Sequence, residues 1–363
     1  MKLVIKQDIL AKALSAVGKI ATPKAGLPIL SNVLLRAEDT KLTVAATNLE
    51  VAMTASLSAQ VDEQGAITVP ARLLTDFVSN LPHANVEINS EETKLKVTCG
   101  GFSSVINAML ADDYPAMPEP DEANELVIDG GTLKAAIQGV AVCAGNDITR
   151  PVLTGVDFYS ENGELYMAAT DGYRLAERHI MATNKALTSI VPSSTLMDVA
   201  RLLPDDDATI KYNDEQMSFI CGDLTVTSRL IDGKYVQYRQ LLPSETNFVA
   251  KVNRADLIKA TRMASLFAHA VANTIVLDGN PEAHTLTVRT ATSQLGNNSS
   301  EIEADFSKVE GDTCSVNVNA KFLADALNNL EGDEATLMFN GGLAPIMLKG
   351  ANPDYRHLIM PVR

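Results

Sequence analysis

The sequence lacks the long hydrophobic runs that membrane proteins carry. No apolar stretch approaches the ~18 residues that a membrane-spanning helix needs. At the start of the chain, Lys6, Asp8 and Lys12 interrupt the apolar pattern, which excludes the continuous apolar region of a secretion signal. The sequence therefore predicts a cytoplasmic protein with no membrane partner.

Cysteine, histidine and the common cofactor motifs are also scarce. The four cysteines lie far apart, without the paired spacing of a redox motif or a zinc site, and the five histidines never pair at a metal-ligand spacing. The chain has no GxxxxGK[ST] phosphate loop, no GxGxxG dinucleotide motif and no GxSxG nucleophile turn. We therefore expect reduced, mostly buried thiols, no metal site and no cofactor.

Positive charge is in deficit. The chain has 30 Lys and Arg residues against 45 Asp and Glu residues, for a net charge of −15. This balance argues against a protein that holds nucleic acid by bulk electrostatic attraction. The length of 363 residues and the hydrophobic content of 46% fit two or three globular domains.

What the sequence does contain is a threefold repeat with a period of about 120 residues. Each copy opens with a short β-like run, a polar or glycine turn and an apolar pattern of helical period; the copies start at Lys2, Leu126 and Phe248. In the first helix the predicted apolar face consists of Ile9, Leu10, Ala13, Leu14 and Val17. Each copy repeats this theme halfway through, at Thr68–Pro82, Ile190–Pro204 and Val316–Gly332.

Between the predicted helices, polar and apolar residues alternate, as they do in half-buried antiparallel strands. Lys41–Thr47, Lys94–Cys99 and Glu164–Thr170 have this pattern. Two Pro- and acid-containing linkers, Met117–Glu125 and Leu241–Asn247, separate the copies. We therefore predict an α+β fold of three repeated domains (1–122, 123–245 and 246–363), each with two amphipathic helices packed on antiparallel sheets.

One phrase recurs at the end of an equivalent strand in each copy, at Thr43–Met53, Met167–Glu177 and Thr287–Asn297. Only the second copy adds Asp171, Tyr173 and Arg174 in close succession. These three residues could belong to the active site of a hydrolase or transferase. Nothing else in the chain supplies a base, a nucleophile or a cofactor cradle for them, so we expect no catalytic residues.

The predicted helices differ in charge from the rest of the chain. They hold nine basic and five acidic residues, a balance of +4 that leaves −19 for the remainder. A positive helical layer could face a polyanion, although Lys and Arg are also good helix formers. The basic residues are Lys12, Lys19, Arg72, Lys134, Arg201, Arg254, Lys259, Arg262 and Lys321.

Six motifs, in order and along the whole chain, resemble the bacterial DNA polymerase III beta subunit family, the sliding clamps. They are Leu27–Leu35, Thr47–Met53, Asp112–Pro118, Ala169–Ala176, Leu230–Pro243 and His357–Arg363. The resemblance implies the DNA clamp fold and a ring of two chains closed head to tail, with helices lining the hole. It also implies a non-catalytic processivity factor that encircles double-stranded DNA and tethers the replicative polymerase and other replication and repair proteins. A repeat scaffold with no nucleic-acid role is the alternative.

The resemblance also implies where DNA and a second copy would bind. Lys24 matches a basic position of the family and joins the helical basic residues as DNA-facing. Leu266 and Phe267 of the third domain are expected to meet the strand around Ile106 of the first domain of another copy. At residues 101–104 this chain has Gly-Phe-Ser-Ser, where family members often place bulky or basic residues.

Finally, the resemblance implies a groove for short hydrophobic peptides of DNA polymerase and clamp-loader subunits. Arg174 and Arg363 are expected at its rim, and Gln240 stands where a basic residue is frequent. The expected groove residues are Leu153, Thr170, Gly172, Tyr173, Arg174, Leu175, Val236, Gln240, Leu241, Leu358, Ile359, Met360, Pro361, Val362 and Arg363.

Overall fold

The computed structural model describes residues 1–23, 26–120, 124–203, 206–243, 245–268, 273–290, 296–310 and 314–362. The chain divides into two compact units. The first contains residues 1–131 and 201–230, and the second contains residues 132–200 and 231–363.

The first unit contains two antiparallel sheets. The five-stranded sheet has the order β5 (Gln60–Glu63), β1 (Lys2–Lys6), β7 (Asn85–Glu91), β8 (Lys94–Cys99), β9 (Phe102–Asn107). The nine-stranded sheet has the order β10 (Met109–Leu110), β6 (Gly65–Pro70), β2 (Asn32–Glu38), β3 (Lys41–Thr47), β4 (Val51–Ser58), β18 (Leu224–Arg229), β17 (Gln216–Cys221), β16 (Asp207–Tyr212), β11 (Glu125–Asp129). Helices α1 (Gln7–Val17) and α2 (Ala71–Ser79) pack against each other.

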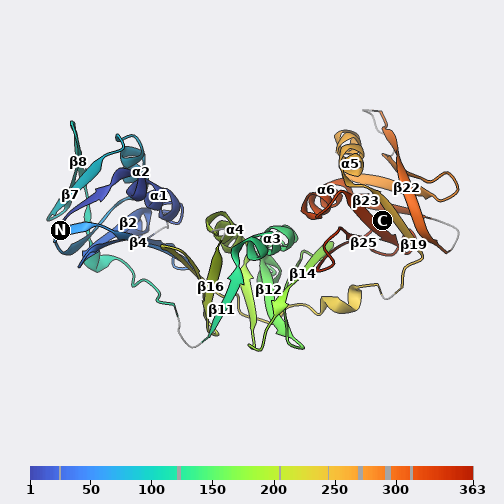
Figure 1. Cartoon of the computed structure of the whole chain (residues 1–363), viewed down its shortest axis with the longest axis horizontal. Coiled ribbons are helices and arrows are strands. Elements are labelled where there is room, and N and C mark those ends of the chain that lie inside the picture. Colours follow the sequence, from blue (N-terminus) through green and yellow to red (C-terminus); the bar gives the residue numbers. More distant parts are fainter. Residues whose placement is uncertain are drawn as a thin grey trace. The chain divides into compact units, whose positions relative to one another are not determined.

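The second unit is built on one twelve-stranded sheet. Its order is β15 (Thr188–Pro192), β12 (Gly155–Glu161), β13 (Glu164–Thr170), β14 (Arg174–Ala182), β26 (Tyr355–Ile359), β25 (Ile346–Lys349), β24 (Glu334–Phe339), β19 (Phe248–Asn253), β22 (Ser299–Val309), β21 (Thr285–Arg289), β20 (Thr274–Asn280), β23 (Ser315–Asn319). Helices α5 (Arg254–Ala268) and α6 (Ala320–Asn329) lie side by side (Figure 1). Helices α3 (Gly130–Ala141) and α4 (Ser193–Leu202) cross the division of the chain between the units.

Short 3-10 helices occur at four places in the described chain. They are η1 (Pro28–Ser31), η2 (Ala111–Asp113), η3 (Pro151–Thr154) and η4 (Tyr238–Leu241). The last of these follows the second repeat and carries two of the residues expected in the peptide groove.

Adjacent sequence repeats are joined by pairing between edge strands. In the first unit β4 pairs with β18, so that Met53 lies opposite Val226. In the second unit β14 pairs with β26, so that Glu177 lies opposite Arg356. Each junction thus satisfies backbone groups that a free edge would leave unpaired.

The predicted periodicity agrees closely with the elements. The strands expected at Lys41–Thr47, Lys94–Cys99 and Glu164–Thr170 are β3, β8 and β13 with those bounds. In α1 the side chains of Leu10, Leu14 and Val17 are fully buried. Ile9 is an exception to the predicted apolar face: it is 38% exposed, because it lies at the margin of the stripe that meets the core.

The four cysteines all lie within the described residues and are free and buried. Among the described side chains, no group of three or more His, Cys, Asp or Glu residues is arranged to hold a metal ion. None of the helices in the described part of the chain has the length and hydropathy that a bilayer crossing requires.

Candidate functional site

The turn between β13 and β14 is fixed by its own side chains. The Thr170 hydroxyl donates to the carbonyl oxygen of Arg174 at 2.6 Å and accepts the N–H of Gly172 at 3.0 Å. The Asp171 carboxylate accepts the N–H groups of Tyr173 and Arg174 at 2.9 and 3.0 Å. Gly172 has φ +90°, a conformation that side-chain-bearing residues rarely adopt. The turn presents Tyr173, which is 67% exposed.

The first repeat builds the same turn between β3 and β4. The Thr47 hydroxyl donates to the carbonyl of Val51 at 3.0 Å and accepts the N–H of Leu49 at 3.0 Å. Leu49, at φ 75°, takes the place of Gly172. The recurring phrase is therefore a structural turn in these two copies, and the second copy differs in what it displays. In the third copy, residues 291–295 lie outside the described residues.

Arg174 was expected at the rim of the groove, and this expectation is wrong. Its side chain is buried and lies behind the turn, where Nε meets Asp171 at 3.0 Å and a terminal nitrogen meets Asp325 of α6 at 2.6 Å. The guanidinium carbon also lies 4.4 Å from the centroid of the Phe322 ring. Two carboxylates satisfy the buried charge, so Arg174 ties the turn to α6 and is not available to solvent.

The C-terminal segment follows β26 and binds directly to this turn. The N–H of Met360 donates to the carbonyl of Tyr173 at 2.8 Å, and the N–H of Val362 donates to the carbonyl of Asn317 in β23 at 2.9 Å. These contacts place the segment between the turn and the start of α6. A pocket of about 590 Å³ results, lined by Gly172, Tyr173, Asn319, Phe322, Met360, Pro361 and Val362. We call it the terminal groove.

Two residues of the terminal groove were missed in the sequence. Asn319 caps α6, because its side-chain oxygen accepts the N–H groups of Lys321 and Phe322 at 3.0 and 3.3 Å. Phe322 fits the apolar face of the helix by spacing, yet its ring is only half-buried and faces the pocket. No separate signal in the sequence distinguishes such a ring from a core residue.

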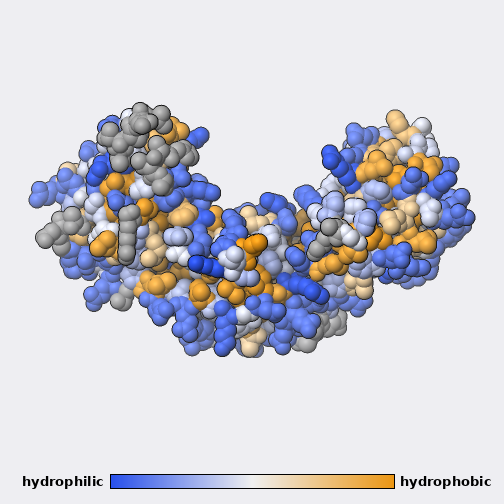
Figure 2. Space-filling view, turned by 180° about the vertical axis from the view of Figure 1, so that it is seen from behind, coloured by the Kyte–Doolittle hydropathy of each residue, from blue (hydrophilic) through white to orange (hydrophobic). Residues whose placement is uncertain are grey.

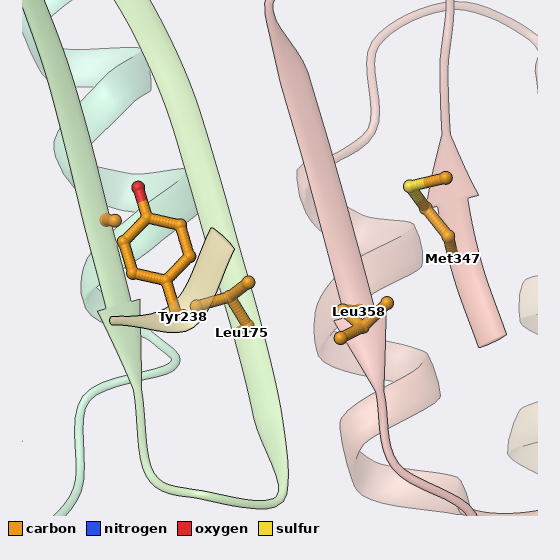
Figure 3. Close-up of a cluster of buried hydrophobic side chains, with 5 residues drawn as sticks. Leu175, Tyr238, Met347 and Leu358 are labelled. Carbon is orange, nitrogen blue, oxygen red and sulfur yellow. The ribbon is translucent and has the colours of Figure 1, made fainter. Parts of the chain in front are cut away.

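Several of the other expected groove residues support the groove from inside the domain. Thr170, Leu175, Leu358 and Ile359 are buried, and Leu153 is half-buried. Leu175 and Leu358 belong to an apolar cluster with Ala168, Tyr238 and Met347 (Figure 3). Val236, Gln240 and Leu241 are exposed in and beside η4. Arg363 lies outside the described residues.

A buried polar cluster lies next to Arg174. The Tyr355 hydroxyl donates to the carbonyl of Gly139 at 3.0 Å and lies 3.0 Å from Nδ1 of His357. Burial lowers the pKa of His357 to about 3 and raises the pKa of the Cys143 thiol well above its ordinary value. The histidine is therefore neutral and the thiol protonated at neutral pH, which leaves neither group activated for nucleophilic chemistry.

The expected DNA-facing residues differ in exposure. Within the described residues, the six α-helices carry eight basic and five acidic residues, because Lys19 lies beyond the end of α1 and not within the helix. Arg254 is half-buried and donates to the carbonyls of Leu327 and Gly332 at 3.2 and 2.7 Å. Lys24 lies outside the described residues. The exposed members are Lys12, Lys19, Arg72, Lys134, Arg201, Lys259, Arg262 and Lys321.

The residues expected at a contact between copies also differ in exposure. Leu266 is 60% exposed near the end of α5, and Phe267 is half-buried. Ile106 is only 3% exposed, so its side chain belongs to the core of its own domain. On the same strand, Phe102 and Val105 are 57% and 59% exposed. Figure 2 shows apolar side chains set among hydrophilic ones on one face of the molecule.

Comparison with known proteins gives a consistent result along the whole chain. Residues 1–118, 127–237 and 239–363 match the N-terminal, central and C-terminal domain models of the DNA polymerase III beta subunit. The beta sliding clamps of Streptomyces coelicolor and Synechococcus elongatus are 31% and 30% identical, each over 100% of this chain and 99% of the relative.

Solved structures agree. The DNA polymerase sliding clamp of Bacillus subtilis superposes with a TM-score of 0.94 at 26% identity and covers 100% of this chain and 99% of its own. The DNA polymerase III subunit beta of Pseudomonas aeruginosa does so with a TM-score of 0.93 at 26% identity, covering 100% of both chains. With three domain models in order, full-length relatives and the same three-domain α+β fold, this chain belongs to the DNA polymerase III beta subunit family.

Proposed function

We propose that this protein is a sliding clamp: two copies close into a ring around double-stranded DNA, without reading its sequence, and tether a replicative polymerase. The three consecutive family matches carry the proposal. The clamp is a non-catalytic, cytoplasmic processivity factor that needs neither metal nor cofactor, and its domains span residues 1–122, 123–245 and 246–363. The same ring serves other replication and repair proteins.

The repeat suggests how the ring closes. Each junction between repeats joins the last strands of two three-stranded antiparallel runs. The strand β4 pairs with β18, and β14 pairs with β26. The equivalent strands that take part in neither junction are β22 of the third repeat and β9 of the first. Among the described residues, Ser299–Glu303 of β22 pair only with β21, and β9 pairs only with β8. Pairing β22 of one copy with β9 of another, head to tail, removes both free edges.

The side chains around these two edges support this pairing. A hollow of about 1230 Å³ runs along residues 300–305 of β22 and is also lined by α5 residues Asp256, Lys259 and Met263. Glu301 and Glu303 are exposed on β22, and Lys94 and Lys96 are exposed on β8, next to β9. These opposite charges favour approach of the two copies, while Leu266 and Phe267 supply apolar contact.

Charge distribution supports enclosure of DNA over tight direct binding. The helices carry a small basic excess in a chain of net charge −15. Within each unit the exposed basic residues of the helices, together with Lys24, would meet phosphates weakly. A ring does not need strong contacts, because topology holds it on the duplex, and weak contacts let it slide.

The terminal groove is proposed as the docking site for partner peptides. Met360 and Pro361 supply apolar walls, Tyr173 and Phe322 supply aromatic ones, and Asn319 adds a polar group. Such a mixed, largely apolar pocket suits an extended segment with aliphatic or aromatic anchors, as polymerase and clamp-loader subunits would provide. Val236, Gln240 and Leu241 in and beside η4 would extend the docking surface.

Equilibrium binding to a short linear duplex tests the electrostatic part of this proposal. We expect weak binding that falls steeply between low and physiological salt, because each neutralised phosphate releases counterions. A repeat scaffold without a nucleic-acid role would give no binding even at low salt. Tight, salt-resistant binding to the short duplex would contradict a clamp that holds DNA by enclosure.

A further inference from the structure

Glu177 of β14 is a buried carboxylate on which three other segments converge. It is 2% exposed, and its Oε2 accepts hydrogen bonds from the hydroxyls of Tyr238 and Tyr159, the latter at 3.3 Å. Nε of Arg239 approaches the same oxygen at 3.3 Å, and Nε of Arg356 donates to Oε1 at 2.8 Å. The carboxylate therefore joins β12, η4 and β26 to β14.

The carboxyl group of Glu177 is ionised in the folded protein. Burial opposes ionisation of Glu177, but the hydrogen bonds from Tyr238 and Arg356 outweigh it and hold the pKa of the carboxyl below its usual value. A carboxylate buried without such partners would strongly destabilise the domain. The network is thus satisfied as a whole and sensitive to the loss of any one donor.

Two of the donors belong to η4, a helix too short to hold its own position. It spans only Tyr238–Leu241, and no side chain caps its N-terminus. Tyr238 packs its ring beside Leu175, in the apolar cluster that also contains Leu358 (Figure 3). Arg239 reaches Glu161 in addition to Glu177, and its guanidinium lies 4.6 Å from the centroid of the Tyr166 ring. The exposed residues Gln240 and Leu241 follow directly on the same turn.

The alternation of β14 explains why one strand can support both sides of the docking surface. Arg174 reaches Asp325 of α6, the helix that carries Phe322 of the terminal groove, whereas Arg178 pairs with Glu331 beyond the end of that helix and away from the groove lining. Leu175 and Glu177, one residue out of phase, meet Tyr238 of η4. Successive side chains of a strand point to opposite faces, so β14 links the terminal groove to η4.

We propose that Glu177 is a positioning residue for partner-peptide docking: its carboxylate fixes η4 and so holds Gln240 and Leu241 where a bound peptide meets them. This inference rests on the proposed function of the terminal groove. A buried residue that does not touch the peptide would then contribute to the affinity for the peptide.

The test uses the full-length chain and two variants that differ in severity. Glu177→Gln removes the charge, and Tyr238→Phe removes one hydroxyl but keeps the ring in the apolar cluster. The matched control is Glu331→Gln, which breaks the 2.9 Å ion pair with Arg178 on the other face of β14. The probe is a fluorescein-labelled hexapeptide with leucine and phenylalanine anchors. We expect Glu177→Gln to weaken its binding by about tenfold, Tyr238→Phe by less, and the control not at all.

A second readout separates positioning from general stability. The chain contains no tryptophan, so Gln237→Trp places a single fluorophore at the exposed start of η4. In this background we expect Glu177→Gln and Tyr238→Phe to lower the tryptophan anisotropy and increase its quenching by acrylamide, while Glu331→Gln leaves both unchanged. Wild-type peptide affinity and unchanged anisotropy in both network variants would overturn the positioning role alone. Failure of the wild-type chain itself to bind the peptide would contradict the docking function as well.

Discussion

The backbone N–H of Met360 donates to the carbonyl oxygen of Tyr173 at 2.8 Å, so the end of the chain is held on the turn between β13 and β14. Nearly two hundred residues of sequence separate these two groups, and the strand pairing of β14 with β26 brings them together. Together with the bond from the Val362 N–H to the Asn317 carbonyl, this contact holds the segment that forms one wall of the terminal groove. The integrity of the groove therefore depends on residues 360–362.

Deletion of Met360–Arg363 should abolish peptide docking without disturbing the ring. The deletion removes three residues that line the terminal groove but leaves β26, which ends at Ile359, intact. Anchor residues in such pockets typically account for ~2 kcal/mol or more each, so affinity should fall well over tenfold. Calorimetry with the labelled peptide measures this loss, and sedimentation checks the dimer. Full peptide affinity in the truncated protein would place docking elsewhere.

Substitution of Phe267 by Asp should open the ring. The Phe267 side chain lies near the end of α5, beside the exposed Leu266. In the proposed contact the introduced aspartate would be buried without a partner of opposite charge. That penalty amounts to several kcal/mol at each of two symmetry-related contacts. Sedimentation should then report a folded monomer of half the dimer mass. The control is Ile148→Asp, at a side chain 86% exposed and outside the proposed contact, and it should stay dimeric. A dimer in both variants would show that Phe267 is not at the interface.

Asp157 should make the stability of the fold depend on pH. Burial raises the pKa of this β12 carboxyl to about 7, above its value in an unfolded chain. Its protonated form is therefore favoured in the folded state, and the associated stability is present at low pH and lost as pH rises. The full loss, from below about pH 4 to well above pH 7, is on the order of 4 kcal/mol.

Thermal unfolding of the wild-type protein and of Asp157→Asn across this pH range measures the effect. The asparagine variant cannot ionise, so its unfolding temperature should rise relative to that of the wild type as pH rises. The difference between the two temperatures should become constant above about pH 7. Parallel curves for the two proteins would show that Asp157 is ionised in the fold throughout.

Replacement of Gly172 by Ala should strain the turn without a steric clash. A Cβ at this position would meet no atom within 4 Å, but the backbone stands at φ +90°. The left-handed conformation costs a residue with a side chain roughly 1–2 kcal/mol, and we expect the free energy of unfolding to fall by that amount. Chemical denaturation tests this. An unchanged free energy would mean that the turn relaxes to another conformation.

Local patterning in the sequence was enough to locate the strands and the repeat. The strands β3, β8 and β13 follow directly from alternation, since a half-buried strand needs an apolar side chain at every second position. The turn at Asp171 could be recognised because its glycine and its Asp and Thr side chains act within a few residues. Such features depend on neighbours along the chain.

Features that depend on distant partners could not be predicted in this way. The burial of Arg174 needs Asp325, which lies about 150 residues further on, and the place of Phe322 in the wall of the terminal groove needs the return of the C-terminal segment. For Ile106 the resemblance indicated the strand but not the direction of the side chain. The register of β9 on β8 decides that this side chain points inward. The first two depend on contacts between segments far apart in the sequence, and the third depends on strand register.

Retention on circular DNA tests the central claim most directly. The protein is loaded onto nicked circular duplex DNA, washed in high salt and followed by gel filtration before and after the circle is cut by a restriction enzyme. Enclosure predicts that the protein survives the wash on the intact circle, because salt screens charge but does not open the ring, and is released once the DNA has ends. Loss from uncut circles at the same rate as from linear DNA would contradict the account.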